Sequence, residues 1–243
     1  MTNGAKLAPL LVGPVHVPRT SAKPTGSAPS KTRSNAKAIL LVFEGVDGVG
    51  KTTLVNRLQR VLRSKGVRCR TASFPGKTPG TLGAHVYALY HDPKKFNVSS
   101  ISQTALQLLV TAAHVEAIEL LVRPSLEKGI TVILDRYWWS TWVYGKASGV
   151  TDSTLSKLIE IEEMSWNDHQ PAALFFLTRR TRSRKRKGDT KQDYQLNKLY
   201  KSLVERELKT GRHPIFVVTN DGSIENAMSQ LWRCLTAIGL PTV

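Results

Sequence analysis

The sequence has few of the residues that build disulfide frameworks or structural zinc sites. Only two cysteines, Cys69 and Cys234, and six histidines occur among 243 residues, and none stands in C-x-x-C or H-x-x-x-H spacing. No apolar run approaches the ~18 residues typical of a membrane span, and no apolar signal-peptide core follows a charged start. These absences argue against a disulfide-rich secreted protein, so we expect a cytoplasmic protein in a reducing compartment.

Acidic residues are also scarce: 18 Asp and Glu stand against 35 Lys and Arg, which gives a formal net charge of +17. The excess lies in two segments, residues 1–38 with six basic residues and no acid, and residues 179–187 (RRTRSRKRK) with seven. Residues 1–37 are rich in Pro, Ser and Ala and predict a disordered basic tail, with an organellar transit peptide as the alternative. The two segments suit polyanions such as nucleotide phosphates, RNA or DNA.

A phosphate-binding motif stands at residues 43–53, FEGVDGVGKTT. Gly45, Gly50, Lys51 and Thr52 have the spacing G-x-x-x-x-G-K-T, between a short apolar run and a stretch with helical periodicity. The glycines allow a tight turn whose N–H groups point at phosphate oxygens, and the helix N-terminus adds partial positive charge. We therefore expect ATP to bind here, with Lys51 on the β and γ phosphates and Thr52 on Mg²⁺. Further ATP-binding residues of the same loop are Gly48 and Thr53.

Apolar strands alternate with amphipathic helices along the rest of the chain, which predicts a three-layer α/β P-loop NTPase fold with a five-stranded parallel sheet. The expected strands are residues 38–43, 67–74, 130–134, 172–177 and 215–219, and the expected helices after the motif helix are 82–90, 99–122, 152–166, 192–208 and 224–238. Ser99 or Ser100 is the expected N-cap of the long helix, which Pro124 breaks or kinks. One domain, residues 38–243, follows the tail.

A second functional signal is Asp135, at the end of the apolar run 130–134, where Walker-type folds hold magnesium. The aromatic stretch WWSTWVY (138–144) follows it, and we expect core or pocket wall there, with Trp138 and Trp139 not both buried.

These motifs together resemble the thymidylate kinase family of nucleoside monophosphate kinases. The matching segments are FEGVDGVGKTT at 43–53, Phe74-Pro75-Gly76, LLVTAAH at 108–114, RPSLEKG at 123–129, and Asp135-Arg136-Tyr137 with Ser140 and Tyr144. They occur in family order from about residue 38 to residue 238, and the first and the DRY motif are the specific ones.

The resemblance implies transfer of the ATP γ-phosphoryl group to the 5′-phosphate of a nucleoside monophosphate, with dTMP as the family default. Arg136 would then offer a bidentate fork to the acceptor phosphate, and Asp47 would lie near the acceptor sugar. The segment at about 178–190 falls at the family's lid, whose candidate catalytic arginines are Arg182 and Arg184. Mg²⁺ is the implied metal, on Thr52 and Asp135. For Asp47 and Arg136 the alternative is a purely structural ion pair.

The chain departs from the family at the acceptor base. Val110 and His114 stand where the family has the Phe and Arg that stack on and hydrogen-bond thymine, and Lys77 is the nearest cation to a missing loop arginine. The other candidate substrate-binding residues are Phe74, Tyr137 and Tyr144. Trp138, Trp139 or Trp142 is the expected replacement stacking surface, and His114 is either a base contact or a structural histidine.

Two alternative functions follow from these patterns. A kinase for a different or modified base is one, and a P-loop module or kinase acting on nucleic acid at a polynucleotide 5′-end is another, although no RNP-like or helix-turn-helix signature supports it. The resemblance also implies a homodimer through helices such as 99–122.

Overall fold

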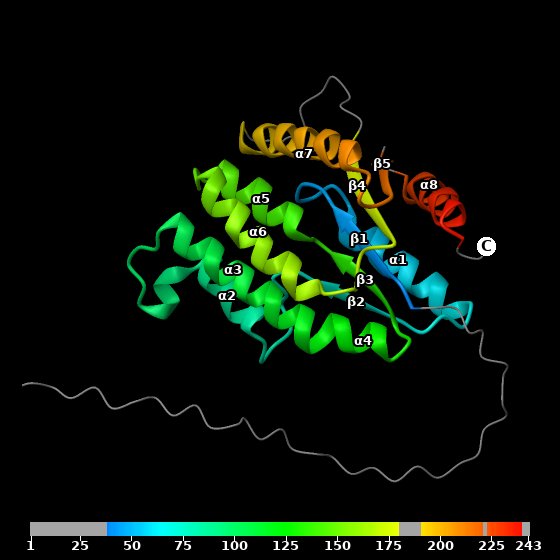
Figure 1. Cartoon of the computed structure of the whole chain (residues 1–243), viewed down its shortest axis with the longest axis horizontal. Helices are drawn as coiled ribbons and strands as arrows, with labels where there is room; N and C mark the ends of the chain where they lie inside the picture. Colours follow the sequence, from blue (N-terminus) through cyan, green and yellow to red (C-terminus); the bar gives the residue numbers. More distant parts are fainter. Residues whose placement is uncertain (1–37, 180–190, 221–222, 240–243) are drawn as a thin grey trace, which may run out of the picture. The chain divides into compact units, whose positions relative to one another are not determined.

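A five-stranded parallel sheet forms the centre of the computed structural model, which describes residues 38–179, 191–220 and 223–239 (Figure 1). The strands are β1 (Leu40–Glu44), β2 (Cys69–Ser73), β3 (Thr131–Asp135), β4 (Ala173–Arg179) and β5 (Ile215–Asn220), in the order β2-β3-β1-β4-β5. Every pairing is parallel, with Leu41 opposite both Ile133 and Ala173. The predicted fold class is therefore confirmed. The predicted tail, 1–37, and lid arginines Arg182 and Arg184 lie outside the described residues.

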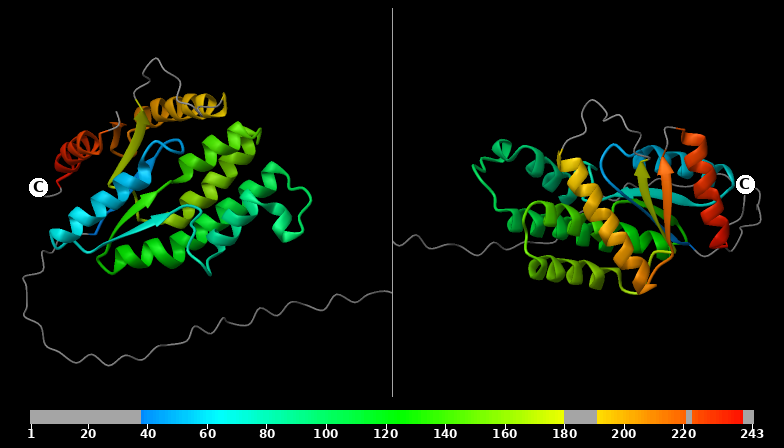
Figure 2. Two further views of the ribbon diagram at one scale, coloured as in Figure 1. Left: turned by 180° about the vertical axis from the view of Figure 1, so that it is seen from behind. Right: turned by 90° about the horizontal axis from the view of Figure 1, so that it is seen from above.

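Helices cover both faces of this sheet, which gives the predicted three layers (Figures 1 and 2). The helices are α1 (Lys51–Ser64), α2 (Leu82–His91), the 3₁₀ turn η1 (Pro93–Phe96), α3 (Gln103–Ala117), the π-helical turn η2 (Ile118–Val122), α4 (Arg123–Glu127), α5 (Trp138–Ala147), α6 (Asp152–Trp166), α7 (Lys191–Thr210) and α8 (Ile224–Ala237). Helices α1 and α8 lie on one face, and α3 to α7 lie on the other.

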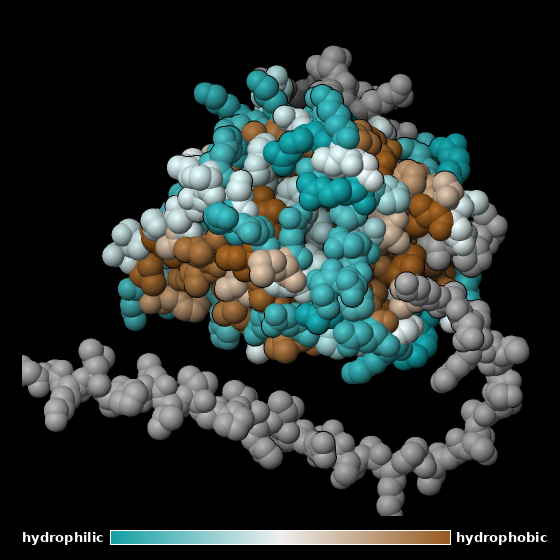
Figure 3. All heavy atoms as spheres, viewed as in Figure 1, coloured by the Kyte–Doolittle hydropathy of each residue, from teal (hydrophilic) through white to brown (hydrophobic). Residues whose placement is uncertain are grey.

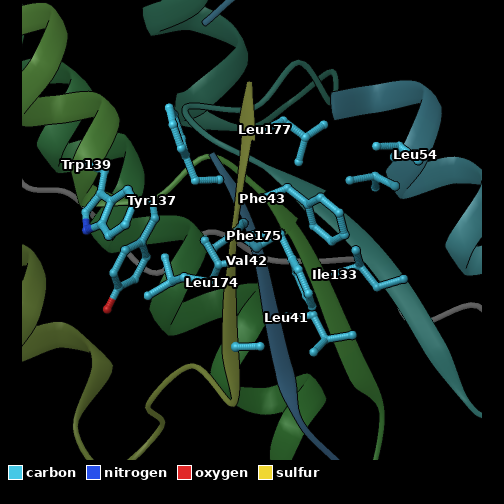
Figure 4. Close-up of a cluster of buried hydrophobic side chains, with 14 of the residues drawn as sticks. Leu41, Val42, Phe43, Leu54, Ile133, Tyr137, Trp139, Leu174, Phe175 and Leu177 are labelled. Carbon is cyan, nitrogen blue, oxygen red and sulfur yellow. The ribbon is translucent and has the colours of Figure 1, made fainter. Parts of the chain in front are cut away.

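The core lies where the central strands meet these helices (Figure 4). All five residues of β1 are buried, because parallel strands with helices on both faces have no solvent side. The rings of Phe43 and Phe175, on neighbouring strands, are 5.0 Å apart, and Phe216 on β5 extends the stack at 5.7 Å from Phe175. Such a core fixes the carboxyl ends of the strands, from which the functional loops leave.

The long helix differs from the prediction at both ends. Its N-cap is Ser102, whose hydroxyl accepts from the amide of Ala105 at 3.2 Å, so the prediction of Ser99 or Ser100 was wrong. Pro124 does not end the helix: α3 passes through η2 into α4, and the proline occupies the first turn of α4. A π-helical turn before the proline removes the need for the amide that proline lacks, so the chain stays helical.

The prediction that Trp138 and Trp139 are not both buried was wrong. They are 3% and 1% exposed. The reason is that α5 packs against α3, α6 and α7, so helices cover more than one of its sides. Neither indole is therefore available as a stacking surface for a substrate base, and Trp142, which is half-buried, has Arg206 over its ring at 5.0 Å.

Among the described residues, the continuous helical stretch Gln103–Glu127 is long and apolar enough by composition to cross a membrane. One such helix is weak evidence, because core helices of other proteins share these properties. Gln107, Thr111 and His114 on this stretch are buried within the fold.

Candidate active site

The candidate site lies at the carboxyl edge of the sheet, where β1 is flanked by β3 on one side and β4 on the other. Strand order reverses at β1, and ligands of open α/β sheets bind outside the carboxyl ends of strands at such a switch point. The loop 45–50 leaves β1 here, and Asp135 ends β3 beside it. The two motifs found in the sequence are thus neighbours in space.

The loop conformation requires glycine at two positions. Gly45 has φ +140°, and a Cβ there would lie 2.5 Å from the carbonyl oxygen of Leu177 on β4. Gly50 has φ +104°, and its Cβ would lie 2.6 Å from Asn220 Nδ2, which donates to the carbonyl of Val49 at 2.7 Å. The loop is therefore pressed against β4 and β5, as a phosphate-binding turn requires.

Gly50 is also the N-cap of α1, and no side chain caps the first amides of this helix. Lys51, only 5% exposed, donates through Nζ to the carbonyls of Gly45 and Val46 at 2.8 and 2.9 Å. Burial, and next the charge of Arg136, lower the pKa of Lys51 to about 8. The ammonium thus lies in a poorly hydrated loop, where attraction to a phosphate anion is strong.

Thr52 and Asp135 meet as the sequence predicts, with Thr52 Oγ1 donating to Asp135 Oδ2 at 2.9 Å. Asp135 Oδ1 is buried and has no hydrogen-bond partner among the described residues. A hydroxyl, a carboxylate and an unsatisfied carboxylate oxygen form a donor set that fits Mg²⁺, which prefers oxygen ligands and completes its shell with water and phosphates. The described residues contain no cluster of three His, Cys, Asp or Glu side chains, and a P-loop metal site does not need one.

Asp47, Arg136 and Tyr144 form a hydrogen-bonded group, here called the Arg136 group, which bridges the P-loop and α5. Arg136 Nη2 donates to Asp47 Oδ1 and, at 3.3 Å, to the Tyr144 hydroxyl, which itself donates to Asp47 Oδ2 at 3.0 Å. Partial desolvation raises the pKa of Asp47, but the charges of Arg136 and Lys51 outweigh it and leave that pKa below its usual value. The Arg136 guanidinium is therefore held beside the exposed Asp47 carboxylate, and the two form an ion pair.

Glu44, Ser140 and Tyr200 lie directly beneath Arg136 and were not among the predicted site residues. Glu44 is fully buried, and its Oε2 accepts from the hydroxyls of Ser140 and Tyr200, each at 2.9 Å. Arg136 Nη1 in turn donates to Ser140 Oγ at 3.0 Å. The sequence did carry a signal, because an acid at the end of an all-apolar strand requires buried partners.

His114 lies in a buried polar cluster between α3, α5 and α6. It is 1% exposed, its Nδ1 is 2.9 Å from Glu162 Oε2, and its ring stacks on Phe74 at 4.4 Å. Thr141 also donates to Glu162 Oε2, at 3.2 Å. These contacts give His114 a structural role, while Val110, one turn earlier, is half-buried. A direct contact between His114 and the base stays a prediction.

The remaining predicted residues are placed less centrally. Tyr137 is buried, and its ring packs against Trp138 and Trp166. Lys77 is exposed and lies over the ring of Tyr87 at 4.2 Å. Thr53 is exposed on the first turn of α1.

Arg179, the last residue of β4, marks the start of the basic segment. Its Nη2 donates to the carbonyl of Gly48 at 2.7 Å. The start of the predicted lid therefore reaches the P-loop.

Comparison with known proteins agrees with this geometry. The family model for thymidylate kinase matches residues 43–231. The thymidylate kinase of Chlorobium chlorochromatii is 36% identical over 140 residues, which are 57% of this chain and 59% of that protein. That of Bartonella quintana is 30% identical over 204 residues, 79% of this chain and 92% of the relative. The chain thus spans about three fifths of the length of the Chlorobium protein and nearly all of the Bartonella one.

Solved structures give the same fold. The thymidylate kinase of Ehrlichia chaffeensis superposes with a TM-score of 0.64 at 22% identity, covering 82% of this chain and 98% of that one. The thymidylate kinase of Candida albicans gives a TM-score of 0.60 at 24% identity, covering 84% and 93%. From its phosphate-binding loop to α8, the chain belongs to the thymidylate kinase family.

Proposed function

We propose that this protein transfers the γ-phosphoryl group of ATP to dTMP, giving ADP and dTDP for nucleotide biosynthesis. The observation that carries the proposal is the convergence of a P-loop, the Thr52–Asp135 pair and the Arg136 guanidinium at one edge of the sheet. Two anionic substrates must be held together against their repulsion, and Lys51 and Arg136 supply positive charge for this.

Each residue has a separate role in this proposal. The loop amides and Lys51 bind the ATP phosphates, and Thr52 and Asp135 hold Mg²⁺. When bound, the metal neutralises charge on the transferring phosphates. Arg136 orients the acceptor phosphate, and Asp47 and Tyr144 fix its guanidinium. No general base is required, because the acceptor oxygen is already anionic. The proposed lid arginines are Arg182 and Arg184.

The acceptor pocket should discriminate weakly between bases. Valine at position 110 is too small to stack on a pyrimidine, and the His114 ring is already occupied by Glu162 and Phe74. Replacing Val110 with Phe and His114 with Arg restores an aromatic ring and a cation, with Glu162 as its nearby carboxylate. A ring contact with a charged hydrogen bond is worth roughly 1–3 kcal/mol, so selectivity for dTMP should rise about tenfold to a hundredfold.

This prediction and the proposed activity share one experiment. Initial rates with ATP and Mg²⁺ are measured for dTMP, dUMP, dCMP, dGMP and dAMP on the wild type and the double variant. The wild type should phosphorylate dTMP, and the ratios of kcat/KM between bases give the selectivity. Absence of turnover with dTMP would contradict the proposed function. Strong wild-type preference for dTMP that the double substitution leaves unchanged would contradict only the weak discrimination.

A second copy of the chain is the proposed partner of the apolar surface over α3 and α6. Large exposed side chains occur on α3 (Leu108), on the adjoining turn η2 (Leu120) and on α6 (Ile161 and Met164), and Met164 is 74% exposed. Brown side chains are also concentrated over α2 and α3 in Figure 3. We expect a homodimer by sedimentation equilibrium, and Leu120→Glu with Met164→Glu should shift it toward monomer. A wild-type monomer at micromolar concentration would contradict the proposal.

A further inference from the structure

We propose that Glu44 and Tyr200 are positioning residues for Arg136, the arginine assigned to the acceptor phosphate. Glu44, at the end of β1, caps the start of α5 and fixes the backbone conformation of Arg136. The inference rests on the proposed function for the identity of the acceptor. It assigns a role to a buried carboxylate and a tyrosine that were not among the predicted site residues.

The first observation is that α5 begins without a cap of its own. Tyr137 is its N-cap residue, and that side chain caps no amide. Instead, Glu44 Oε1 accepts from the amides of Tyr137 at 2.6 Å and Ser140 at 3.1 Å, the N-cap and N3 positions. The Ser140 amide also donates to the carbonyl of Tyr137 at 2.9 Å, so Glu44 is the acceptor for the Tyr137 amide and a second acceptor for that of Ser140. The charge of a carboxylate is favourable at the positive end of the helix. Glu44 therefore acts as an N-cap supplied by β1.

The second observation concerns the backbone of Arg136 itself. Its φ is +81°, in the left-handed region that residues with a Cβ adopt only at an energetic cost. Hydrogen bonds hold the chain on both sides of it: the Arg136 amide donates to the carbonyl of Phe43 at 2.9 Å, and the next amide, of Tyr137, donates to Glu44. Such a conformation persists only where the surroundings over-determine it, and Glu44 supplies one of the two restraints.

The third observation is a hydrogen-bonded chain from α7 to the guanidinium. Tyr200, fully buried, donates to Glu44 Oε2, Ser140 donates to the same oxygen, and Arg136 donates to Ser140 Oγ. The Tyr200 and Ser140 hydroxyls are also 2.9 Å apart. This chain of hydrogen bonds links α7 to the acceptor arginine.

Every group hydrogen-bonded to Glu44 donates to it, as an ionised carboxylate requires, and the nearby charges of Arg136 and Lys51 are positive. With the Gly45 amide at 3.3 Å, the two oxygens accept from three amides and two hydroxyls. Burial raises the pKa of Glu44, and the nearby charges of Arg136 and Lys51 lower it in part. Glutamine is nearly isosteric but has one acceptor oxygen in place of two. Its NH₂ group would face either the amides of Tyr137 and Ser140 or the amide of Gly45, which can only donate, and the negative charge would be lost.

The experiment compares Tyr200→Phe and Glu44→Gln with a matched control, Tyr194→Phe, which makes the same change at a 76% exposed position of the same helix. Tyr200→Phe loses the hydrogen bond from Tyr200 to Glu44, which should raise the KM for dTMP about threefold to tenfold. The increase should be larger in Glu44→Gln. The KM for ATP should stay within about twofold, and the control should match the wild type. A residue that only stabilised the fold would not separate the two KM values.

Amide hydrogen exchange supplies a readout that does not depend on the substrate. Under native conditions without denaturant, the amides of Tyr137 and Ser140 should exchange faster in Tyr200→Phe and Glu44→Gln than in the wild type. The amides of β1 and β3 should keep their protection against exchange. Unchanged protection at the start of α5, or parallel changes in both KM values, would overturn the positioning role. A wild type that does not phosphorylate dTMP would contradict the proposed function alone, and the exchange result would still decide the role of Glu44.

Discussion

Replacing Lys51 with methionine should reduce kcat/KM for ATP-dependent phosphorylation by about a hundredfold to a thousandfold. The side chain supplies a buried cation to the phosphates, and a preorganised charge in a poorly hydrated site is worth about 3–4 kcal/mol to a transition state. Methionine keeps most of the side-chain volume, so packing against the loop changes little. Lys51→Ala should lose as much activity, and the comparison separates charge from volume.

The same substitution should leave the fold intact, for an electrostatic reason. A lysine whose pKa falls from 10.5 to about 8 is costly to keep charged in the folded state, by roughly 3 kcal/mol. Below pH 8 Lys51 is protonated in both the folded and the unfolded protein, and the full cost of burying its charge is present. Between about pH 8 and 10.5 only the unfolded protein holds this proton, so the free energy of unfolding rises with pH. At pH 7 methionine removes this cost while it loses the two hydrogen bonds to Gly45 and Val46. The melting temperature of Lys51→Met should therefore lie close to that of the wild type.

Thermal unfolding and steady-state rates of the two variants test both statements. Near-normal turnover by a folded Lys51→Met protein would remove the kinase interpretation. Unfolding of both variants at room temperature would instead show that Lys51 is required for the fold, and our electrostatic argument would be wrong.

The sequence predicted those parts of the molecule whose structure depends on residues close to one another along the chain. The apolar runs at 38–43, 130–134 and 172–177 correspond to the largely buried strands β1, β3 and β4. The helix over 152–166 occurs with those bounds, and Thr151 caps its start. The P-loop was predictable because two of its glycines are required by contacts with β4 and β5. The Thr52–Asp135 contact followed from topology, since neighbouring parallel strands end at the same edge.

Features that depend on distant packing could not be predicted in the same way. The burial of both Trp138 and Trp139 depends on three helices that meet α5 from other parts of the chain. Glu162, the partner of His114, is 48 residues away from it, and Tyr200, the partner of Glu44, is 156 residues away. Buried hydrogen-bonded pairs of this kind have no periodicity, and a single sequence does not show which residues face each other.

Replacing Arg136 with alanine should impair use of dTMP far more than binding of ATP. The guanidinium is the fork that we assign to the acceptor phosphate, and it is held by Asp47, Ser140 and Tyr144. Charge-assisted hydrogen bonds are worth about 1.5–3 kcal/mol each, so losing a bidentate pair should lower kcat/KM for dTMP by about a hundredfold to ten-thousandfold. Arg136→Lys should recover only part of this, because an ammonium keeps the charge and loses the fork.

The comparison with Asp135→Asn separates the acceptor side from the metal side. That variant should require several-fold more Mg²⁺ for half-maximal rate, with the KM for dTMP little changed, because a neutral amide is a weaker ligand for a hard cation than a carboxylate. Arg136→Ala should show the reverse pattern, with normal Mg²⁺ dependence and a raised KM for dTMP. Both residue 136 variants carry a Cβ at the same left-handed backbone, so strain at φ +81° is common to them and to the wild type. If ATP affinity collapsed in Arg136→Ala while dTMP kinetics were unaffected, the guanidinium would belong to the nucleotide side, and the roles that we assign to Arg136 and Lys51 would have to be redistributed.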